Sequence, residues 1–406
     1  MSKTAAALLV LVFLVAAFLT ASDLASGGEV VEDYWETVAP LPKPYYGVIG
    51  AAAADGKIYF LGLEVFERYD PYTDTWMGVA PPSDYHPWSA VVACQNKIYA
   101  IGYPTQVYDP ATNIWENKTS IPKTLAGGYT PVVINDKIYV IGGVEPAPLG
   151  VLAISSTNYV YDPATDSWST MAPIPTPVTG YAATVLDNKI YIISGGTLES
   201  AYMGNTTDMV QIFDPERNQW INGTPIPTGV YKAGACSTSG LFAPKRIYVA
   251  GGKVDFSQGG TSADLVDYGV NLTQVYNPET GIWSTAASTP DVRWSLSLVN
   301  VRDALYAVGG LNGTVRVFVS GDLSNWEAAK QLMSTIRVQA TEKYIPIGYD
   351  ESPLPTPSPS PTPSLSPDPQ PEPFPTVPVA AAFIAVIVVV VGLLVYYKKR
   401  ERGMTR

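Results

Sequence analysis

The sequence predicts an all-β fold made of repeated four-stranded units, and two observations lead to this prediction. A strand ending in Lys-Ile-Tyr is followed by glycine and then by Tyr-Asp-Pro-x-Thr-x-x-Trp, most clearly from Lys137 through Gly142-Gly143 to Trp168. The same order of residues then returns along most of the chain. Self-similarity at a spacing of about 40–50 residues is typical of repeat architectures.

The register of the repeat follows from its aromatic residues. An aromatic stands seven residues before the tryptophan and is followed by Asp-Pro or Asn-Pro in five units, whereas the sixth unit has Val319 there. Asp or Asn starts a tight turn by bonding its own backbone, and proline fixes φ at the next position. The tyrosine of the first half recurs at Tyr59, Tyr99, Tyr139, Tyr191, Tyr248 and Tyr306, and the tryptophan at Trp35, Trp76, Trp115, Trp168, Trp220, Trp283 and Trp326.

Each unit divides into four strands. In the clearest copy we expect strands over residues 129–134, 137–141, 159–161 and 167–171, with a short turn at Asn135-Asp136. Four antiparallel strands per unit, repeated along the chain, predict a β-propeller.

The motif resembles the Kelch repeat, whose Gly-Gly doublet, spaced tyrosine and tryptophan stand here at Gly142, Gly143, Tyr161 and Trp168. The doublet, aromatic and tryptophan recur at Gly195, Gly196, Phe213 and Trp220, and at Gly251, Gly252, Tyr276 and Trp283. The resemblance covers about residues 34–349 and implies a Kelch-type β-propeller over residues 30–350. It implies little about function, because such folds host many unrelated activities.

The number of blades depends on how the ends are counted. Seven pairs of first and second strands are present if residues 336–348 form the last pair, and seven tryptophan strands if Trp35 starts the first. The sequence therefore favours seven blades and leaves six open. We expect the closing blade to combine inner strands from the C-terminal end with the outer strand of Trp35, so that Trp35 and Tyr344 share a blade.

The two ends predict export and membrane anchoring. Residues 1–21 resemble a secretory signal peptide, with an uncleaved N-terminal anchor as the alternative. Residues 379–397 carry no charge and are followed by a basic tail at 398–406, which predicts one transmembrane helix with the tail in the cytoplasm. Residues 351–378 alternate Pro with Ser and Thr, as in an extended stalk. We expect a single-pass protein of the cell membrane with the propeller outside.

The binding face is predicted from insertions between the second and third strands, at residues 144–158, 197–212 and 253–275. The third insertion carries Asp255, Asp264 and Asp267, which suggest either a Ca²⁺ loop or, with no fixed ligand spacing, a solvated acidic loop. Aromatics near the start of most first strands could stack on sugars or anchor a partner, or could fill space between blades. They are Tyr46, Trp88, Tyr129, Tyr181, Tyr231 and Trp294.

One further feature fits an exported head. Five N-glycosylation sequons are present, at Asn117, Asn205, Asn222, Asn271 and Asn312. Cys94 and Cys236 lie in equivalent apolar strands of different repeats, where we expect buried free thiols and no disulfide.

No catalytic constellation is visible in the sequence. His86 is the only histidine, so neither a two-histidine copper site nor a zinc cluster can form, and no cofactor or metal is expected. The net charge of −11 argues against nucleic acid. We therefore expect a non-enzymatic surface protein that binds a protein or glycan. The alternative is a carbohydrate-active enzyme of the sugar epimerase or hydrolase type, which the Kelch resemblance leaves open because paired carboxylates have no sequence signature.

Overall fold

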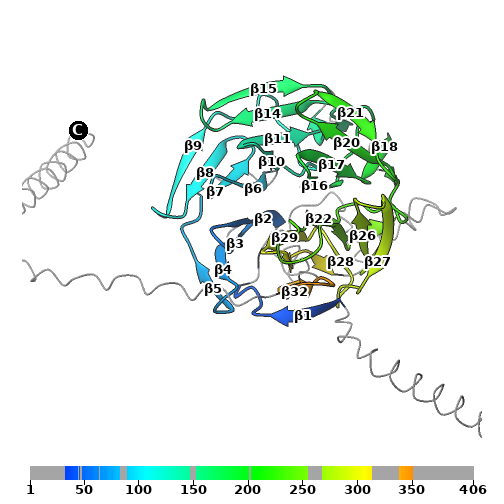
Figure 1. Cartoon of the computed structure of the whole chain (residues 1–406). Coiled ribbons are helices and arrows are strands. Elements are labelled where there is room, and N and C mark those ends of the chain that lie inside the picture. The colour runs from blue at the N-terminus through cyan, green and yellow to red at the C-terminus, as the bar shows by residue number, and fades with distance from the viewer. Residues whose placement is uncertain are drawn as a thin grey trace, which may run out of the picture. The chain divides into compact units, whose positions relative to one another are not determined.

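The computed structural model describes residues 33–43, 45, 48–63, 65–82, 89–146, 152–200, 203–254, 268–312 and 338–350. These residues form six four-stranded antiparallel sheets arranged as the blades of a β-propeller (Figure 1). Among them there is no helix with the length and apolarity to cross a membrane. The predicted signal peptide, stalk, transmembrane helix and basic tail lie outside the described residues.

Five blades follow the chain without interruption, each with its first strand nearest the central axis. The first two are β2 (Val48–Ala54), β3 (Lys57–Gly62), β4 (Val65–Asp70) and β5 (Thr75–Gly78), and then β6 (Ala90–Cys94), β7 (Lys97–Ile101), β8 (Thr105–Asp109) and β9 (Ile114–Lys118). The third is β10 (Val132–Ile134), β11 (Lys137–Ile141), β14 (Asn158–Asp162) and β15 (Ser167–Met171). The fourth is β16 (Ala182–Leu186), β17 (Lys189–Ile193), β20 (Val210–Asp214) and β21 (Gln219–Asn222). The fifth is β22 (Gly234–Ser237), β23 (Ile247–Ala250), β26 (Thr273–Asn277) and β27 (Ile282–Ala286).

The sixth blade closes the ring with strands from both ends of the described chain. Its order is β29 (Ser297–Val301), β30 (Ala304–Val308), β32 (Thr341–Ile345) and β1 (Tyr34–Val38), and Figure 1 shows the blue β1 beside the orange β32. Trp35 pairs with Tyr344 across the last two strands, as the sequence predicted.

The prediction of seven blades was wrong. Residues 338–348, the described part of the expected last pair, do not supply a new pair of inner strands. Instead they supply β32 alone, which pairs with β30 on one side and with β1 on the other. It is therefore the third strand of the sixth blade. Val319 and Trp326, which seemed to mark a separate outer strand, lie outside the described residues.

The turns within each blade explain why the spacing of the motif recurs from unit to unit. Between β10 and β11, Asn135 and Asp136 have φ of 50° and 58°, as a two-residue turn with both residues left-handed requires. Between β14 and β15, the Asp162 carboxylate accepts the Ala164 N–H at 3.0 Å, which makes the predicted turn. The neighbouring Lys137 ammonium holds the pKa of this carboxyl below its usual value.

Aromatic rings join every blade to the next. The tyrosine of each second strand meets the aromatic of the following blade's third strand, with centroids 5.4 to 6.3 Å apart. That second aromatic packs on the tryptophan of its own blade, 4.9 to 5.3 Å away. The contacts between blades are Tyr59–Tyr108, Tyr99–Tyr161, Tyr139–Phe213, Tyr191–Tyr276, Tyr248–Tyr344 and Tyr306–Tyr69.

A polar clamp accompanies the rings at each boundary. The indole N–H of each tryptophan donates to a carbonyl just after the outer strand of the preceding blade, at 2.7 to 3.0 Å. The residue whose carbonyl accepts the indole N–H also donates its own backbone N–H. In five of the boundaries this N–H bonds to an Asp or Asn side chain two residues before the tryptophan, at 2.7 to 3.1 Å. At the closure, Trp35 and Asp33 hold Ala287 in this way.

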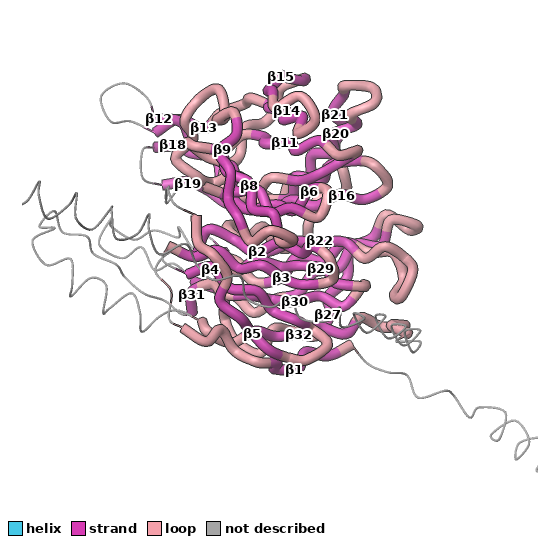
Figure 2. The backbone as a smooth tube through the Cα atoms, turned by 90° about the vertical axis from the view of Figure 1, so that its left-hand side faces the viewer, coloured by secondary structure: helices cyan, strands magenta, loops and turns pink. Residues whose placement is uncertain are grey.

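Short two-stranded extensions lengthen four blades on one face. Three of them are hairpins: β12 (Val144–Pro146) with β13 (Leu152–Ile154), β18 (Gly196–Ser200) with β19 (Met203–Thr206), and β24 (Lys253–Val254) with β25 (Tyr268–Gly269). In the sixth blade, β28 (Arg293–Trp294), which precedes the first strand, pairs with β31 (Leu311–Asn312), which follows the second. Figure 2 shows β12, β13, β18, β19 and β31 projecting to the same side. The three hairpins lie in the predicted insertions, so the prediction that the insertions share a face is confirmed.

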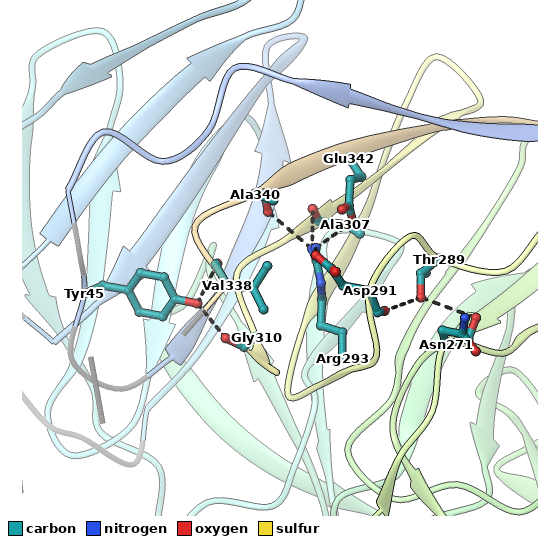
Figure 3. A network of polar contacts seen from close by, with 10 residues as sticks. All are labelled: Tyr45, Asn271, Thr289, Asp291, Arg293, Ala307, Gly310, Val338, Ala340 and Glu342. Atoms are coloured by element: carbon teal, nitrogen blue, oxygen red, sulfur yellow. Dashed lines mark hydrogen bonds and ion pairs between the residues drawn. The ribbon is translucent and has the colours of Figure 1, made fainter. Parts of the chain in front are cut away.

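A buried charge pair sits inside the closing blade (Figure 3). The Arg293 side chain is fully buried, and its Nη2 lies 2.7 Å from Oε2 of Glu342 in β32. Burial raises the pKa of Glu342, and Asp291 acts in the same direction, while Arg293 opposes both. Nearby, the Tyr45 hydroxyl donates to the carbonyls of Gly310 and Val338, which joins the first blade to the sixth.

Replacing Trp35 with alanine should weaken the closure. The change removes the ring contact with Tyr344 and the indole bond to Ala287, and we expect a loss of roughly 2–4 kcal/mol in the free energy of unfolding. Denaturant titration measures it. The matched control is Tyr34→Thr in the same strand, at a side chain 44% exposed, with an expected change within about 0.5 kcal/mol. Equal effects of the two changes would contradict the role of Trp35.

A second prediction concerns the clamp in two blades that differ by one hydroxyl. The Tyr108 hydroxyl donates to Asn113 at 2.8 Å, whereas the equivalent Phe213 has none to offer to Asn218. We expect Tyr108→Phe to cost about 1 kcal/mol and Phe213→Tyr to be neutral or stabilising by up to about 1 kcal/mol. Thermal unfolding of the two variants measures both changes in stability. A stabilising Tyr108→Phe together with a destabilising Phe213→Tyr would contradict the role of the hydroxyl in the clamp.

Candidate functional site

The hairpin-bearing face is built where the chain passes from one blade to the next. In the third to sixth blades, the segment before the first strand pairs with the residues at or just after the glycine doublet of the same blade. In the fifth blade Tyr231 pairs with Lys253, and in the sixth Trp294 pairs with Leu311. Side chains of the linker and of the hairpin are thereby brought together beside the central axis.

A line of backbone hydrogen bonds crosses this face from the third blade to the sixth. Gly180 N–H donates to Gly128 O at 2.9 Å, Lys232 N–H to Gly180 O at 2.6 Å, and Ser295 N–H to Lys232 O at 2.8 Å. All four residues have left-handed backbone, with φ between 53° and 74°. The line fixes the four linkers relative to one another.

Two of the predicted aromatics are buried between blades. Tyr129 and Tyr181 are at most 7% exposed. The Tyr129 hydroxyl donates to Ile101 O at 3.0 Å, and the Tyr181 hydroxyl donates to Ile141 O, each in the preceding blade. Both residues therefore fill the boundary between blades and fasten it.

Tyr231 and Trp294 lie elsewhere, two residues earlier in the register of the repeat, and are half-buried. The Tyr231 ring covers Gly180, where a Cβ would come within 2.1 Å of it. Two lysines stand over these rings. Lys253 Nζ is 3.6 Å from the centroid of Trp294, and Lys232 Nζ is 5.6 Å from the same centroid and 5.4 Å from that of Tyr231. We call Tyr231, Lys232, Lys253 and Trp294 the cation–aromatic cluster.

The sequence analysis missed the two lysines, although a signal was present. At the position of Lys232 the neighbouring blades have Gly128, Gly180 and Ser295. At the position of Lys253, directly after the doublet, the third and sixth blades have Val144 and Leu311. Among the third to sixth blades, only the fifth has lysine at the position before the first strand and at the position after the glycine doublet.

The comparisons with known proteins agree with this architecture. A family model for the KLHDC2/KLHL20/DRC7 Kelch-repeats domain matches residues 88–310. The chain belongs to this Kelch-repeat family. A solved structure titled "Structure of YjhT" resembles the Kelch propeller with a TM-score of 0.57 and 19% identity, over 68% of this chain and 94% of that one, which supports the fold alone.

Relatives of known sequence share the repeat. Kelch-like protein 35 of Mus musculus is 31% identical over 41% of this chain and 29% of its own length, and Kelch-like protein 23 of Mus musculus is 26% identical over 70% and 48%. Alpha-scruin of Limulus polyphemus is 27% identical over 62% and 27%. The chain thus spans less than half the length of each of these relatives.

Five predicted site residues lie outside the described residues: Tyr46, Trp88, Asp255, Asp264 and Asp267. The one histidine of the sequence, His86, lies outside them as well. Within the described part, no group of three or more His, Cys, Asp or Glu is arranged to hold a metal ion. Tyr45, the neighbour of the predicted Tyr46, contributes to the contact between the first and sixth blades through its hydroxyl.

The asparagines of four sequons, Asn117, Asn222, Asn271 and Asn312, have exposed side chains, and Asn205 lies in β19. Their glycosylation stays a prediction. The prediction of buried free thiols is confirmed, because Cys94 and Cys236 are both buried and unpaired. Burial raises the pKa of the Cys94 thiol to about 11, so neither its thiolate nor that of Cys236, whose pKa is raised further, suits a nucleophile near neutral pH.

The opposite face of the Kelch propeller has one unusual loop, which was also missed. Residues 239–245 join β22 to β23 and wrap around the buried carboxylate of Asp303, which accepts N–H groups from Ser239, Leu241, Phe242 and Ala243. Burial alone would raise the pKa of Asp303, but these N–H groups outweigh it and lower the pKa. Leu241 is left 81% exposed at the tip.

Proposed function

We propose that this Kelch-repeat chain is a binding protein of the cell surface that engages a protein partner through its hairpin-bearing face. The observation that carries the proposal is that three hairpins and the paired strands β28 and β31 extend the blades on that face. Length added to one face of a repeat array, and held by a rigid scaffold, is where binding residues concentrate.

The chemistry of that face supports binding over catalysis. Among the described residues of that face, two rings and two ammonium groups meet in the cation–aromatic cluster. Such groups bind by contact area and charge, and tyrosine and tryptophan are frequent anchors of protein interfaces. The relatives described above carry the names Kelch-like protein and scruin, which are not names of enzymes.

The location at the cell surface is proposed from the sequence. The uncharged run 379–397, the basic residues after it and the Pro-rich segment 351–378 together suit a single span with an extended stalk. The apolar segment within residues 1–21 suits export of the head.

A photo-crosslinking amino acid tests the binding face. Placed in the full-length chain at Pro146, an exposed position in β12, it should give discrete protein adducts on cells that express the chain. The matched control carries it at Leu241, on the opposite face, and should give none. Adducts from Leu241 alone would assign binding to the other face. Absence of adducts from both sites would contradict a protein-binding role.

An epitope tag tests the topology. Inserted after Asp350, at the end of the propeller, it should bind antibody on intact cells, because the head is proposed to lie outside. The same tag after Arg406 should bind only once the membrane is permeabilised. Antibody binding to the Arg406 tag on intact cells would overturn the proposed orientation.

A further inference from the structure

We propose that the buried pair of Arg293 and Glu342 selects β32 as the third strand of the sixth blade. The pair lies between β28 and β32, in the blade that joins the two ends of the described chain (Figure 3). It makes closure of the ring specific to one strand and adds little to the stability of the closed ring.

The aromatic motif does not distinguish one third strand from another. In β32, Tyr344 packs on Trp35 and meets Tyr248 of the preceding blade. An equivalent aromatic stands in every other third strand, at Tyr69, Tyr108, Tyr161, Phe213 and Tyr276. Any of these strands, supplied by a second copy of the chain, would therefore offer the sixth blade a similar ring. Wrong assembly of similar units is a characteristic failure of repeat proteins.

The residue two positions before this aromatic does distinguish the strands. In β20 and β26 it is a glutamine, whose amide accepts the N–H and donates to the carbonyl of a linker threonine, at 2.9 to 3.0 Å. These pairs are Gln211 with Thr176 and Gln274 with Thr228. In β32 the residue is Glu342, and the linker position holds a second acid, Asp291. An ionised carboxylate only accepts hydrogen bonds, so the neutral contact of the neighbouring blades cannot form here.

Arg293 stands where the neighbouring blades have a buried valine. In the fourth and fifth blades the equivalent residues are Val178 and Val230, each two residues before the line of backbone hydrogen bonds that crosses the hairpin-bearing face. Both valines are 1% exposed, and Arg293 is 0% exposed. The sixth blade has thus exchanged two residues together, valine for arginine and glutamine for glutamate.

The contacts of Arg293 place one cation between two acids. Its Nη2 lies 2.7 Å from Oε2 of Glu342 and 3.8 Å from Oδ2 of Asp291, and its Nη1 donates to Ala340 O at 3.3 Å. Within the part of the chain that the structure describes, Nε and Nη2 of Arg293 and Oε2 of Glu342 have no hydrogen bond of good geometry. A buried ion pair bonded so incompletely does not offset the full cost of removing both groups from water.

A different third strand would leave the guanidinium of Arg293 with only the half-exposed Asp291 nearby. Loss of one partner of a buried ion pair is strongly destabilising, so strands without a carboxylate at this place fit the sixth blade poorly. β4 does carry one, Glu67, but its Oε1 lies 3.5 Å from Lys43 in the first blade. The residues of the remaining third strands are Gln106, Tyr159, Gln211 and Gln274.

Urea titration of the full-length chain tests whether the pair serves stability. Glu342→Gln alone removes the nearest anion of a buried guanidinium, so we expect a lower denaturation midpoint. Adding Arg293→Val gives the sixth blade the residues of the fourth and fifth. We then expect the midpoint to return to that of the original chain or to exceed it, because a buried ion pair replaced by neutral groups is often neutral or stabilising.

A disulfide across the closure tests selectivity in the same chains. Glu36 and Lys343 are opposite each other in β1 and β32, so Glu36→Cys with Lys343→Cys reports whether the two strands of one chain have paired. The native thiols, Cys94 and Cys236, are buried. After refolding and oxidation, a non-reducing gel separates disulfides within one chain from those between chains. We expect the fraction formed within one chain to fall about twofold when Arg293→Val and Glu342→Gln are both present.

The matched control neutralises a different ion pair, Lys97 with Asp109 in the second blade, through Lys97→Gln with Asp109→Asn. It should form the disulfide within one chain as fully as the original does. An equally high fraction in the Arg293→Val, Glu342→Gln variant would overturn the proposed selectivity. A midpoint for that variant below the midpoint of the original chain, or failure of the variant to fold, would show that the pair serves stability and would overturn the proposal as well.

Discussion

The boundary between successive blades is the interaction on which the rest of this structure depends. A single blade of a repeat fold cannot bury its hydrophobic faces by itself and needs its neighbours to cover them. Here each sheet is completed by its neighbour, through one aromatic contact and one tryptophan hydrogen bond that recur around the whole ring, the closure included. The Asp or Asn before the tryptophan adds a second polar contact at most boundaries. The residues of the repeated motif thus serve mainly to pack each blade against the next.

Much of this could be predicted from the sequence, because the motif residues act locally or on the adjacent unit. The turn at Asn135-Asp136, the face of the insertions and the shared blade of Trp35 and Tyr344 all followed from spacing. The number of blades did not follow from spacing. Residues 336–348 resemble two strands but supply only β32, and the sequence of one strand does not determine which strands pair with it.

The candidate site was less predictable for a physical reason. The sequence places four aromatics near the starts of first strands: Tyr129, Tyr181, Tyr231 and Trp294. The first two are buried between blades, whereas the last two lie two residues earlier in the repeat and are half-buried. Neither lysine was predicted, because their departure from the repeat shows only when equivalent positions of the blades are compared. The left-handed backbone of Lys232 is visible only in the structure. The loop around Asp303 depends on a carboxylate about 60 residues away in the chain.

The closing blade also sets the order of events during synthesis. Asp33 and Tyr344, which bond across the last two strands, are 311 residues apart. A ribosome that adds roughly 5–20 residues per second needs about 15–60 s to make that stretch. Throughout this interval β1 lacks its partner strand β32. Closure of the ring is therefore a late step, and a chaperone that acts on the chain during synthesis meets it before its two ends have joined.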